Sequence, residues 1–228
     1  KRKRIKEDTG SDRCMLRCNK IKAFLSGLVG MVFLISVAVI LTLSCKSLYK
    51  ADMRHLRLAE ETGYSEEEIL VNYEELIDYN LSSFHKELKF PTFPMSDEAR
   101  IHFEEVKVIF QGFLHIMVVN GILFVLIAIR MAKKSDWLFL KYTGICSIAI
   151  PSVLGGMIAL NWEKVFITFH ELVFQNDYWL FDPVTDPVIL VLPDEYFMHC
   201  AIMIIGIVLL GAGVSLGIYH IKSGERKQ

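Results

Sequence analysis

The stretch that places this chain in its structural class is IKAFLSGLVGMVFLISVAVILTLS, residues 21–44. It contains one charged side chain, Lys22, and it exceeds the ~20 residues that an α-helix needs to cross ~30 Å of hydrocarbon. It is also longer than the ~7–15-residue apolar core of a cleaved signal peptide. The stretch therefore predicts a retained membrane-spanning helix.

Three more apolar stretches of similar length follow, at residues 108–129, 138–160 and 201–219. The chain has 228 residues, of which 53% are hydrophobic and 22% are charged. Because the four stretches take up so much of it, too little remains for a large separate soluble domain, and a disordered chain would be far more polar. The sequence predicts an all-α integral membrane protein with four transmembrane helices.

Charge is distributed unevenly over the connecting segments. Basic residues dominate segment 1–20, loop 130–137 and tail 220–228, whereas connections 46–107 and 161–200 carry most of the 26 acidic residues. Loops rich in Lys and Arg remain on the cytoplasmic side of a membrane. Both termini are therefore expected to be cytoplasmic and both acidic connections to face outward. The basic N-terminal segment is interpreted as this orientation signal rather than as a nucleic-acid-binding arm.

The first outward connection, residues 46–107, is too long for a bare loop. Ser65 begins a capping box that ends at Glu68, and apolar residues then recur at helical spacing. Ser96 has the character of a second N-cap, and the helical pattern after it continues into the second span without a breaker. The sequence therefore predicts a partly helical extracellular cap.

The second outward connection, residues 161–200, is rich in aromatic side chains. Its first part suits a short helix that lies in the membrane interface. In the last span, Gly213 and Gly217 have the spacing that permits close contact between helices. This glycine pair predicts helix packing and no chemistry.

Two outward histidines are candidates for proton transfer close to the membrane. His102 lies roughly 9 Å along a helix before the second span, and His170 lies in the aromatic segment after the third. Histidine is the side chain best suited to moving protons near neutral pH. Glu98 and Glu105 share the helical face of His102. A structural role in an interfacial aromatic belt is the alternative for both histidines.

Other polar residues offer further candidates. His55 and His85 also lie in the outward segments, and His115 lies with Asn120 inside the second span. Two interpretations of that last pair are equally plausible: an intramembrane polar site, or a hydrogen bond between packed helices. Asp182 is interpreted as a turn or cap residue that is also placed to orient a catalytic histidine.

Several familiar catalytic motifs are missing from the sequence. It has no Gly-x-Ser-x-Gly elbow, no phosphate-binding glycine loop and no His-x-x-x-His pair. A serine-based acyl-enzyme and a nucleotide-dependent reaction are therefore both disfavoured.

The segment SDEARIHFEEVK, residues 96–107, resembles the S-x-x-E-x-x-H-M-x-D-V-K signature of the bacterial lipoprotein intramolecular transacylase family. The stretches 169–174 and 179–186 resemble that family's second signature, and 192–197 resembles its closing P-x-x-F-F element. The resemblance covers most of the chain, including the order of the four spans.

The first signature is matched with three departures. Phe103 stands where the family has Met, and Glu105 stands where it has Asp. Glu98 is one residue out of register with the signature's Glu, so no family role is carried over to it.

The resemblance implies modification of membrane lipoproteins whose N-terminal cysteine carries a diacylglyceryl thioether. The family moves the sn-2 acyl chain to the α-amine of that cysteine and leaves an N-acyl, S-monoacylglyceryl (lyso) lipoprotein. Its two essential histidines map onto His102 and His170. The implied partners are these lipoproteins and membrane lipid, in the bacterial cell membrane with the site at the outer leaflet. No metal, cofactor or nucleic acid is implied.

The chemistry fits an acid–base pair of histidines, because ester aminolysis needs the ammonium deprotonated and a proton delivered to the departing glyceryl oxygen. Which histidine acts as base is open. The working hypothesis is that His170 deprotonates the amine. His102, polarised by Glu105, then assists at the ester. Interfacial aromatic side chains are expected to wall a confined substrate pocket; these are Phe169, Phe174, Tyr178 and Trp179.

Two functions of other classes remain. A non-enzymatic membrane module that binds or senses a partner would tolerate replacement of both histidines. A small transporter subunit would use His115 and Asn120 and would need a polar path across all four spans. Lys141 is the only charged residue near another span, at its cytoplasmic end, so the sequence supports such a path poorly.

Overall fold

The computed structural model describes residues 10–84 and 87–225, with the side chains of residues 10–16 left out. His85 and most of the basic residues at the start of segment 1–20 lie outside the described residues. Within the described ranges the chain is entirely helical, with no strand. The predicted all-α class is confirmed.

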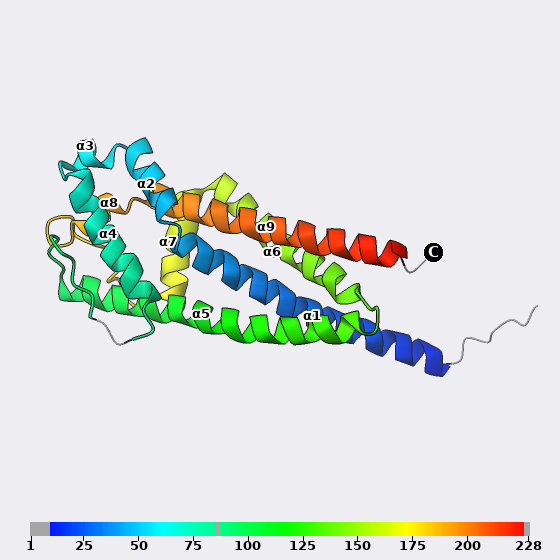
Figure 1. Cartoon of the computed structure of the whole chain (residues 1–228). Coiled ribbons are helices and arrows are strands. Elements are labelled where there is room, and N and C mark those ends of the chain that lie inside the picture. Colours follow the sequence, from blue (N-terminus) through cyan, green and yellow to red (C-terminus); the bar gives the residue numbers. More distant parts are fainter. Residues whose placement is uncertain (1–9, 85–86, 226–228) are drawn as a thin grey trace, which may run out of the picture.

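Four helices are long and apolar enough to cross a membrane. They are α1 (Gly10–Leu43), α5 (Asp97–Ala132), α6 (Leu138–Leu160) and α9 (Asp194–Glu225). Figure 1 shows them side by side, with the start of α1 and the end of α9 at the same end of the molecule. The predicted count of four spanning helices is confirmed.

Helix α5 is much longer than the membrane is thick. Its 36 residues measure about 54 Å, against ~30 Å of hydrocarbon. Ser96 caps its start, because the Ser96 hydroxyl accepts a hydrogen bond from the Ala99 N–H at 3.0 Å. The first turns of α5 therefore project beyond the bundle (Figure 1), as the N-cap at Ser96 predicted.

Helix α1 lies at the centre of the bundle and packs against α5, α6 and α9. At Gly27 the backbones of α1 and α6 approach so closely that a Cβ would lie 2.5 Å from Cβ of Tyr142. The predicted contact at Gly213 and Gly217 is wrong, since both glycines have open space around them. Spacing alone does not show which face of a helix meets a neighbour.

The shorter helices other than α7 (Trp162–Val173) form a cap on the other end of the bundle. The cap comprises α2 (Lys46–His55), α3 (Leu58–Thr62), α4 (Glu66–Leu81) and α8 (Val188–Val191), with the first turns of α5 and α9. Helix α4 begins as predicted, with the Ser65 hydroxyl accepting from the Glu68 N–H. The sequence indicated neither α2 nor α3.

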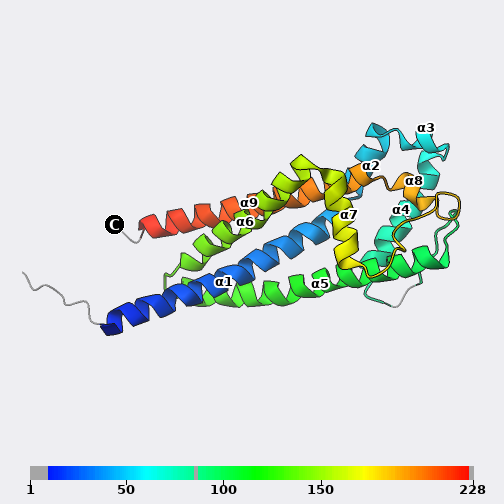
Figure 2. The ribbon, with the colours of Figure 1, turned by 180° about the vertical axis from the view of Figure 1, so that it is seen from behind.

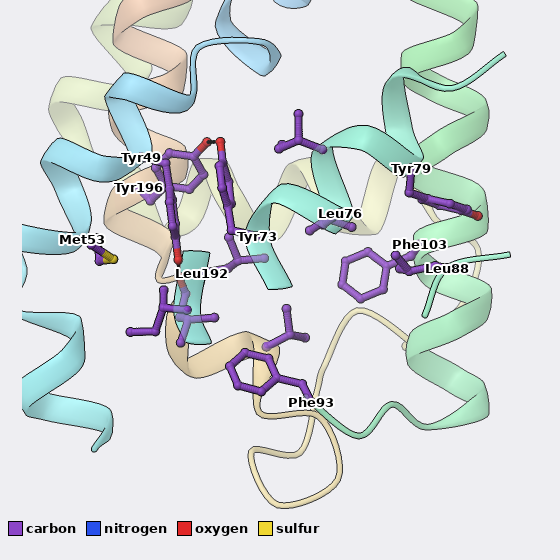
Figure 3. Packing of buried hydrophobic residues seen from close by; sticks show 14 of the residues in the cluster. Tyr49, Met53, Tyr73, Leu76, Tyr79, Leu88, Phe93, Phe103, Leu192 and Tyr196 are labelled. Carbon is purple, nitrogen blue, oxygen red and sulfur yellow. Dashed lines mark hydrogen bonds between the residues drawn. The ribbon is translucent and has the colours of Figure 1, made fainter. Parts of the chain in front are cut away.

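Three tyrosines form the centre of the cap (Figure 3). The rings of Tyr49 and Tyr73 are stacked 3.6 Å apart, and Tyr196 packs edge-on against both. The Tyr49 hydroxyl donates to the carbonyl of Val191 at 2.7 Å, and the hydroxyls of Tyr73 and Tyr196 lie 2.9 Å apart. These contacts join α2, α4 and α8 to the start of α9.

Helix α7 (Trp162–Val173) lies across the junction of bundle and cap, running from the end of α6 towards α5 (Figure 2). The indole N–H of Trp162 donates to the carbonyl of Asp194, at the start of α9. Beyond α7, the Asp186 carboxylate accepts from the Ser96 N–H at 2.7 Å. The segment after α7 is therefore tied to the first turn of α5.

We expect Asp186→Ala to destabilise the protein by about 1–3 kcal/mol, because it leaves the half-buried Ser96 N–H without its acceptor. Asp182→Ala is the matched control, since among the described residues that exposed carboxylate accepts a hydrogen bond from the nearby Val184 N–H alone. It should cost no more than about 0.5 kcal/mol. Thermal unfolding in one detergent compares the two variants, and an equal loss would contradict the role of Asp186 as an anchor.

Candidate active site

The structure brings His102 and His170 together where α5 and α7 meet. Their ring centroids are 6.2 Å apart and their planes are inclined by 28°. A general acid or base works at about 2.6–3.2 Å from the atom with which it exchanges a proton. One small substrate group between the two rings would therefore be within reach of both.

His102 is enclosed by aromatic side chains and is only 6% exposed. The rings of Phe174, Phe181 and Phe103 lie 4.6, 5.4 and 5.8 Å from it. Its Nδ1 is buried and has no hydrogen-bond partner in the described part of the chain. Since buried polar atoms are normally paired, this nitrogen is available to a substrate.

His170 is held in one tautomer by its own helix. Its Nδ1 lies 2.8 Å from the carbonyl oxygen of Phe166, one turn earlier in α7. A carbonyl can only accept, so Nδ1 carries the proton and Nε2 of the neutral ring carries the free lone pair. Burial lowers the pKa of His170, against an opposing effect of that hydrogen bond. The ring is therefore neutral at pH 7 and ready to accept a proton at Nε2.

Glu105 follows His102 by one turn of α5. Its Oε1 accepts a hydrogen bond from the side chain of Asn176 at 3.0 Å. Its Oε2 is buried without a partner among the described residues. No hydrogen bond joins Glu105 to His102 there, so the carboxylate is held by the loop after α7 rather than by the imidazole.

Three of the four aromatic residues predicted to wall a pocket contact the histidines. Phe169 and Trp179 lie 5.4 and 4.8 Å from the ring of His170, and Phe174 packs against both histidines. Tyr178 is 38% exposed and has no ring contact with either histidine in the described structure. Its N–H donates to the side chain of Asn176.

Asp182 lies at the surface of the loop after α7. Its Oδ1 accepts from the Val184 N–H at 2.8 Å, which is the bond of a turn residue. Within the described ranges it has no hydrogen bond to a histidine. The arrangement matches its interpretation as a turn residue and offers no contact through which it would orient His170 or His102.

The intramembrane polar pair is not assembled into a site. His115 bonds to the carbonyl of Gln111 and Asn120 to that of Ile116, each four residues earlier in α5. Each side chain therefore bonds to its own helix, and no hydrogen bond joins the two in the described structure. The described residues also include no group of three or more His, Cys, Asp or Glu placed to hold a metal ion.

Comparison with protein families adds a decisive observation. A family model described as lipoprotein intramolecular transacylase Lit matches residues 24–197, which span both histidines, the cap and three of the four long helices. The chain belongs to the lipoprotein intramolecular transacylase family. It is accordingly an acyltransferase that modifies lipoproteins, built as an integral membrane protein.

Solved structures of a transacylase agree with this assignment. The chain is similar to the membrane integral lipoprotein intramolecular transacylase Lit from Bacillus cereus, with 32% identity, a TM-score of 0.88, and coverage of 91% of this chain and 97% of that one. A variant of that enzyme with one histidine replaced by alanine matches with 31% identity and a TM-score of 0.84, over 95% of this chain and 99% of that one. No curated protein sequence matches significantly.

Sequence reasoning missed two contributors to this candidate site. The Phe166 carbonyl that orients His170 had a local signal, because a helical histidine can bond to the carbonyl four residues earlier. The contact of Asn176 with Glu105 had none, because the two residues are far apart in the chain and neither belongs to a pattern that specifies the other.

We expect His170 to titrate below the ordinary histidine value of about 6.5, because burial lowers its pKa. His170 then remains neutral at a pH just below 6.5, and it becomes protonated only when the pH falls below its lowered pKa. Phe174→Ala should raise the pKa towards 6.5 by admitting water. Imidazole NMR in micelles, assigned with His170→Asn, measures both, and a wild-type midpoint at or above 6.5 would contradict the effect of burial.

Proposed function

We propose that the chain transfers the sn-2 acyl group of a diacylglyceryl lipoprotein to the α-amine of the same N-terminal cysteine, with His102 and His170 as an acid–base pair. The observation that carries this proposal is the pairing of a buried imidazole, His102, with a half-buried one, His170, at a ring separation of 6.2 Å, the second of them held with a free Nε2. Family membership supports the reaction class, and the solved histidine variant of the Bacillus cereus enzyme is in keeping with a histidine role.

The reaction needs no group beyond substrate and side chains. The amine nitrogen attacks the ester carbonyl, a C–N bond forms, and the bond from the carbonyl carbon to the glyceryl oxygen breaks. One proton leaves the nitrogen and one arrives on the glyceryl oxygen, so no water is consumed. The product has the same atoms as the substrate and therefore the same mass.

His170 is the base in this scheme. Its Nδ1–H is engaged with the Phe166 carbonyl, so a proton from the amine enters at Nε2. That hydrogen bond also stabilises the imidazolium that forms, while burial keeps the ring neutral beforehand. The hydrogen bond and the burial together are the physical reason for assigning the amine to His170.

His102 acts at the ester. Its buried Nδ1 has no competing partner, so a hydrogen bond to the reacting ester group is its available contact. We assign it the delivery of a proton to the departing glyceryl oxygen, and the proton that His170 takes from the amine replaces it, so that both rings end neutral. Each proton transfer of this kind contributes typically about 10²–10⁴-fold to the rate.

Attack within one molecule reduces the catalytic task to positioning. Holding amine and ester together replaces a bimolecular step by a unimolecular one. The aromatic rings around both histidines would exclude water, which would otherwise hydrolyse the ester.

The site would lie at the outer leaflet of the bacterial cell membrane, with both chain termini in the cytoplasm. The uneven distribution of basic residues supports this orientation. Around α7 the side chains of Phe169, Leu172 and Leu180 are exposed, and such an apolar surface suits contact with lipid. Acyl chains would then remain in the membrane while the peptide extends into the cap.

Expression in bacteria whose lipoproteins are diacylglyceryl forms with free N-termini tests the proposal, with mass spectra of the N-terminal lipopeptide as the readout. We expect wild type to leave the mass unchanged and to place one acyl group on nitrogen. His102→Asn and His170→Asn should each lower conversion about 10²–10⁴-fold.

His55→Asn is the matched control, because His55 is an exposed histidine of the cap, at the end of α2. It should convert as wild type does. A free amine on the diacylglyceryl form, despite folded wild-type protein in the membrane, would refute the reaction. Full conversion by either site variant would refute the role of that histidine.

A further inference from the structure

One helical turn after His102, a carboxylate oxygen has no hydrogen-bond partner among the residues that the structure describes. Oε2 of Glu105 is buried and has no hydrogen-bond partner in the described chain. None of the ion pairs among the described residues includes Glu105. A buried carboxylate oxygen without a donor is costly, and native proteins normally keep such atoms for a ligand or a water.

Glu105 differs in this respect from its neighbour on the same helix. The carboxylate of Glu104 is exposed and accepts from the guanidinium of Arg100 at 2.7 Å. Glu105 instead points away from solvent, and Asn176 holds its Oε1 at 3.0 Å. The amide fixes one oxygen of the carboxylate and leaves the other in place for a donor.

Both ends of this contact are connected to the histidine pair. Glu105 follows His102 by three residues, so the two side chains share one face of α5. Asn176 follows Phe174 by two residues, and the Phe174 ring lies 4.6 Å from His102 and 5.6 Å from His170. The unpaired Oε2 and the unpaired Nδ1 of His102 thus belong to the same small region of the protein.

We propose that Oε2 of Glu105 binds the α-ammonium group of the substrate's N-terminal cysteine. This inference rests on the proposed function and names the group by which the site recognises its substrate. An ammonium has only donors, and a hydrogen bond from a charged donor to a carboxylate is about twice as strong as a neutral one. Asn176 is a positioning residue, which acts on the substrate only through Glu105.

The ion pair also discriminates between substrate and product in binding. Before transfer the nitrogen is cationic and pairs with Glu105. The ammonium first releases one proton to solvent and becomes the attacking amine; a second proton leaves the nitrogen through His170 as the acyl group is added, and the nitrogen is then a neutral amide. The product therefore loses the charge that held the substrate, which favours its release.

Binding of two unreactive lipopeptides tests this inference on the full-length protein in detergent. Both carry a dialkylglyceryl ether in place of the diester, so neither can donate an acyl group; one has a free amine and the other is N-acetylated. We expect wild type to bind the free amine about tenfold more tightly. Glu105→Gln should reduce this preference to about twofold or less.

Glu104→Gln is the matched control, because it removes the adjacent carboxylate on the same turn of α5. It should keep the tenfold preference. Asn176→Ala should weaken the preference while leaving affinity for the N-acetylated lipopeptide unchanged, an effect that a merely structural role would not produce. Affinity for that neutral ligand also reports whether each variant is folded.

Three results would overturn the inference: a wild type that binds both lipopeptides equally, a preference that persists in Glu105→Gln, or an equal loss in Glu104→Gln. Because neither ligand reacts, these outcomes are separate from failure of the proposed function, which the lipopeptide mass spectra report. A protein that binds neither lipopeptide would overturn this inference too.

Discussion

Within hydrocarbon a backbone N–H or C=O without a partner costs several kcal/mol, so a chain crosses a membrane as an unbroken helix. In this protein α5 remains unbroken beyond the length needed to cross the membrane, and it runs as one helix from its N-cap at Ser96 in the cap to Ala132. His102 lies in the second turn of this helix, so its position relative to the bundle is fixed by the helix itself. Everything else at the site is built around that fixed position.

The cap places the second histidine against the first. Helix α7 lies across the bundle, and its Trp162 is hydrogen-bonded to the start of α9, while the segment after it is tied to Ser96 through Asp186. The stacked tyrosines of the cap in turn hold α2 and α4 against α9. His170 is thus held from both ends of its own segment, which gives α7 the precise placement that the proposed acid–base chemistry needs.

Withdrawing two imidazoles from water, one buried and one half-buried, has a cost in desolvation and a use in the proposed chemistry. Desolvation lowers the pKa of His170, which keeps it neutral when the substrate arrives. The carbonyl of Phe166 leaves Nε2 as the nitrogen that would take a proton in the proposed reaction. Such a site is poor at storing a charge and suited to passing a proton on, as a transfer within one substrate molecule requires. The family to which the chain belongs performs a transfer of that class.

The sequence by itself determined the four spans and the helix starts at Ser65 and Ser96, because hydropathy and capping depend on neighbours along the chain. It also singled out His102 and His170, partly through motifs that resemble a known family. Only the tertiary structure decided that Gly27 rather than Gly213 is a close contact, and that Asn176 rather than His102 holds Glu105. Those contacts depend on which faces of distant segments meet, and that is set by the packing of the whole bundle and cap.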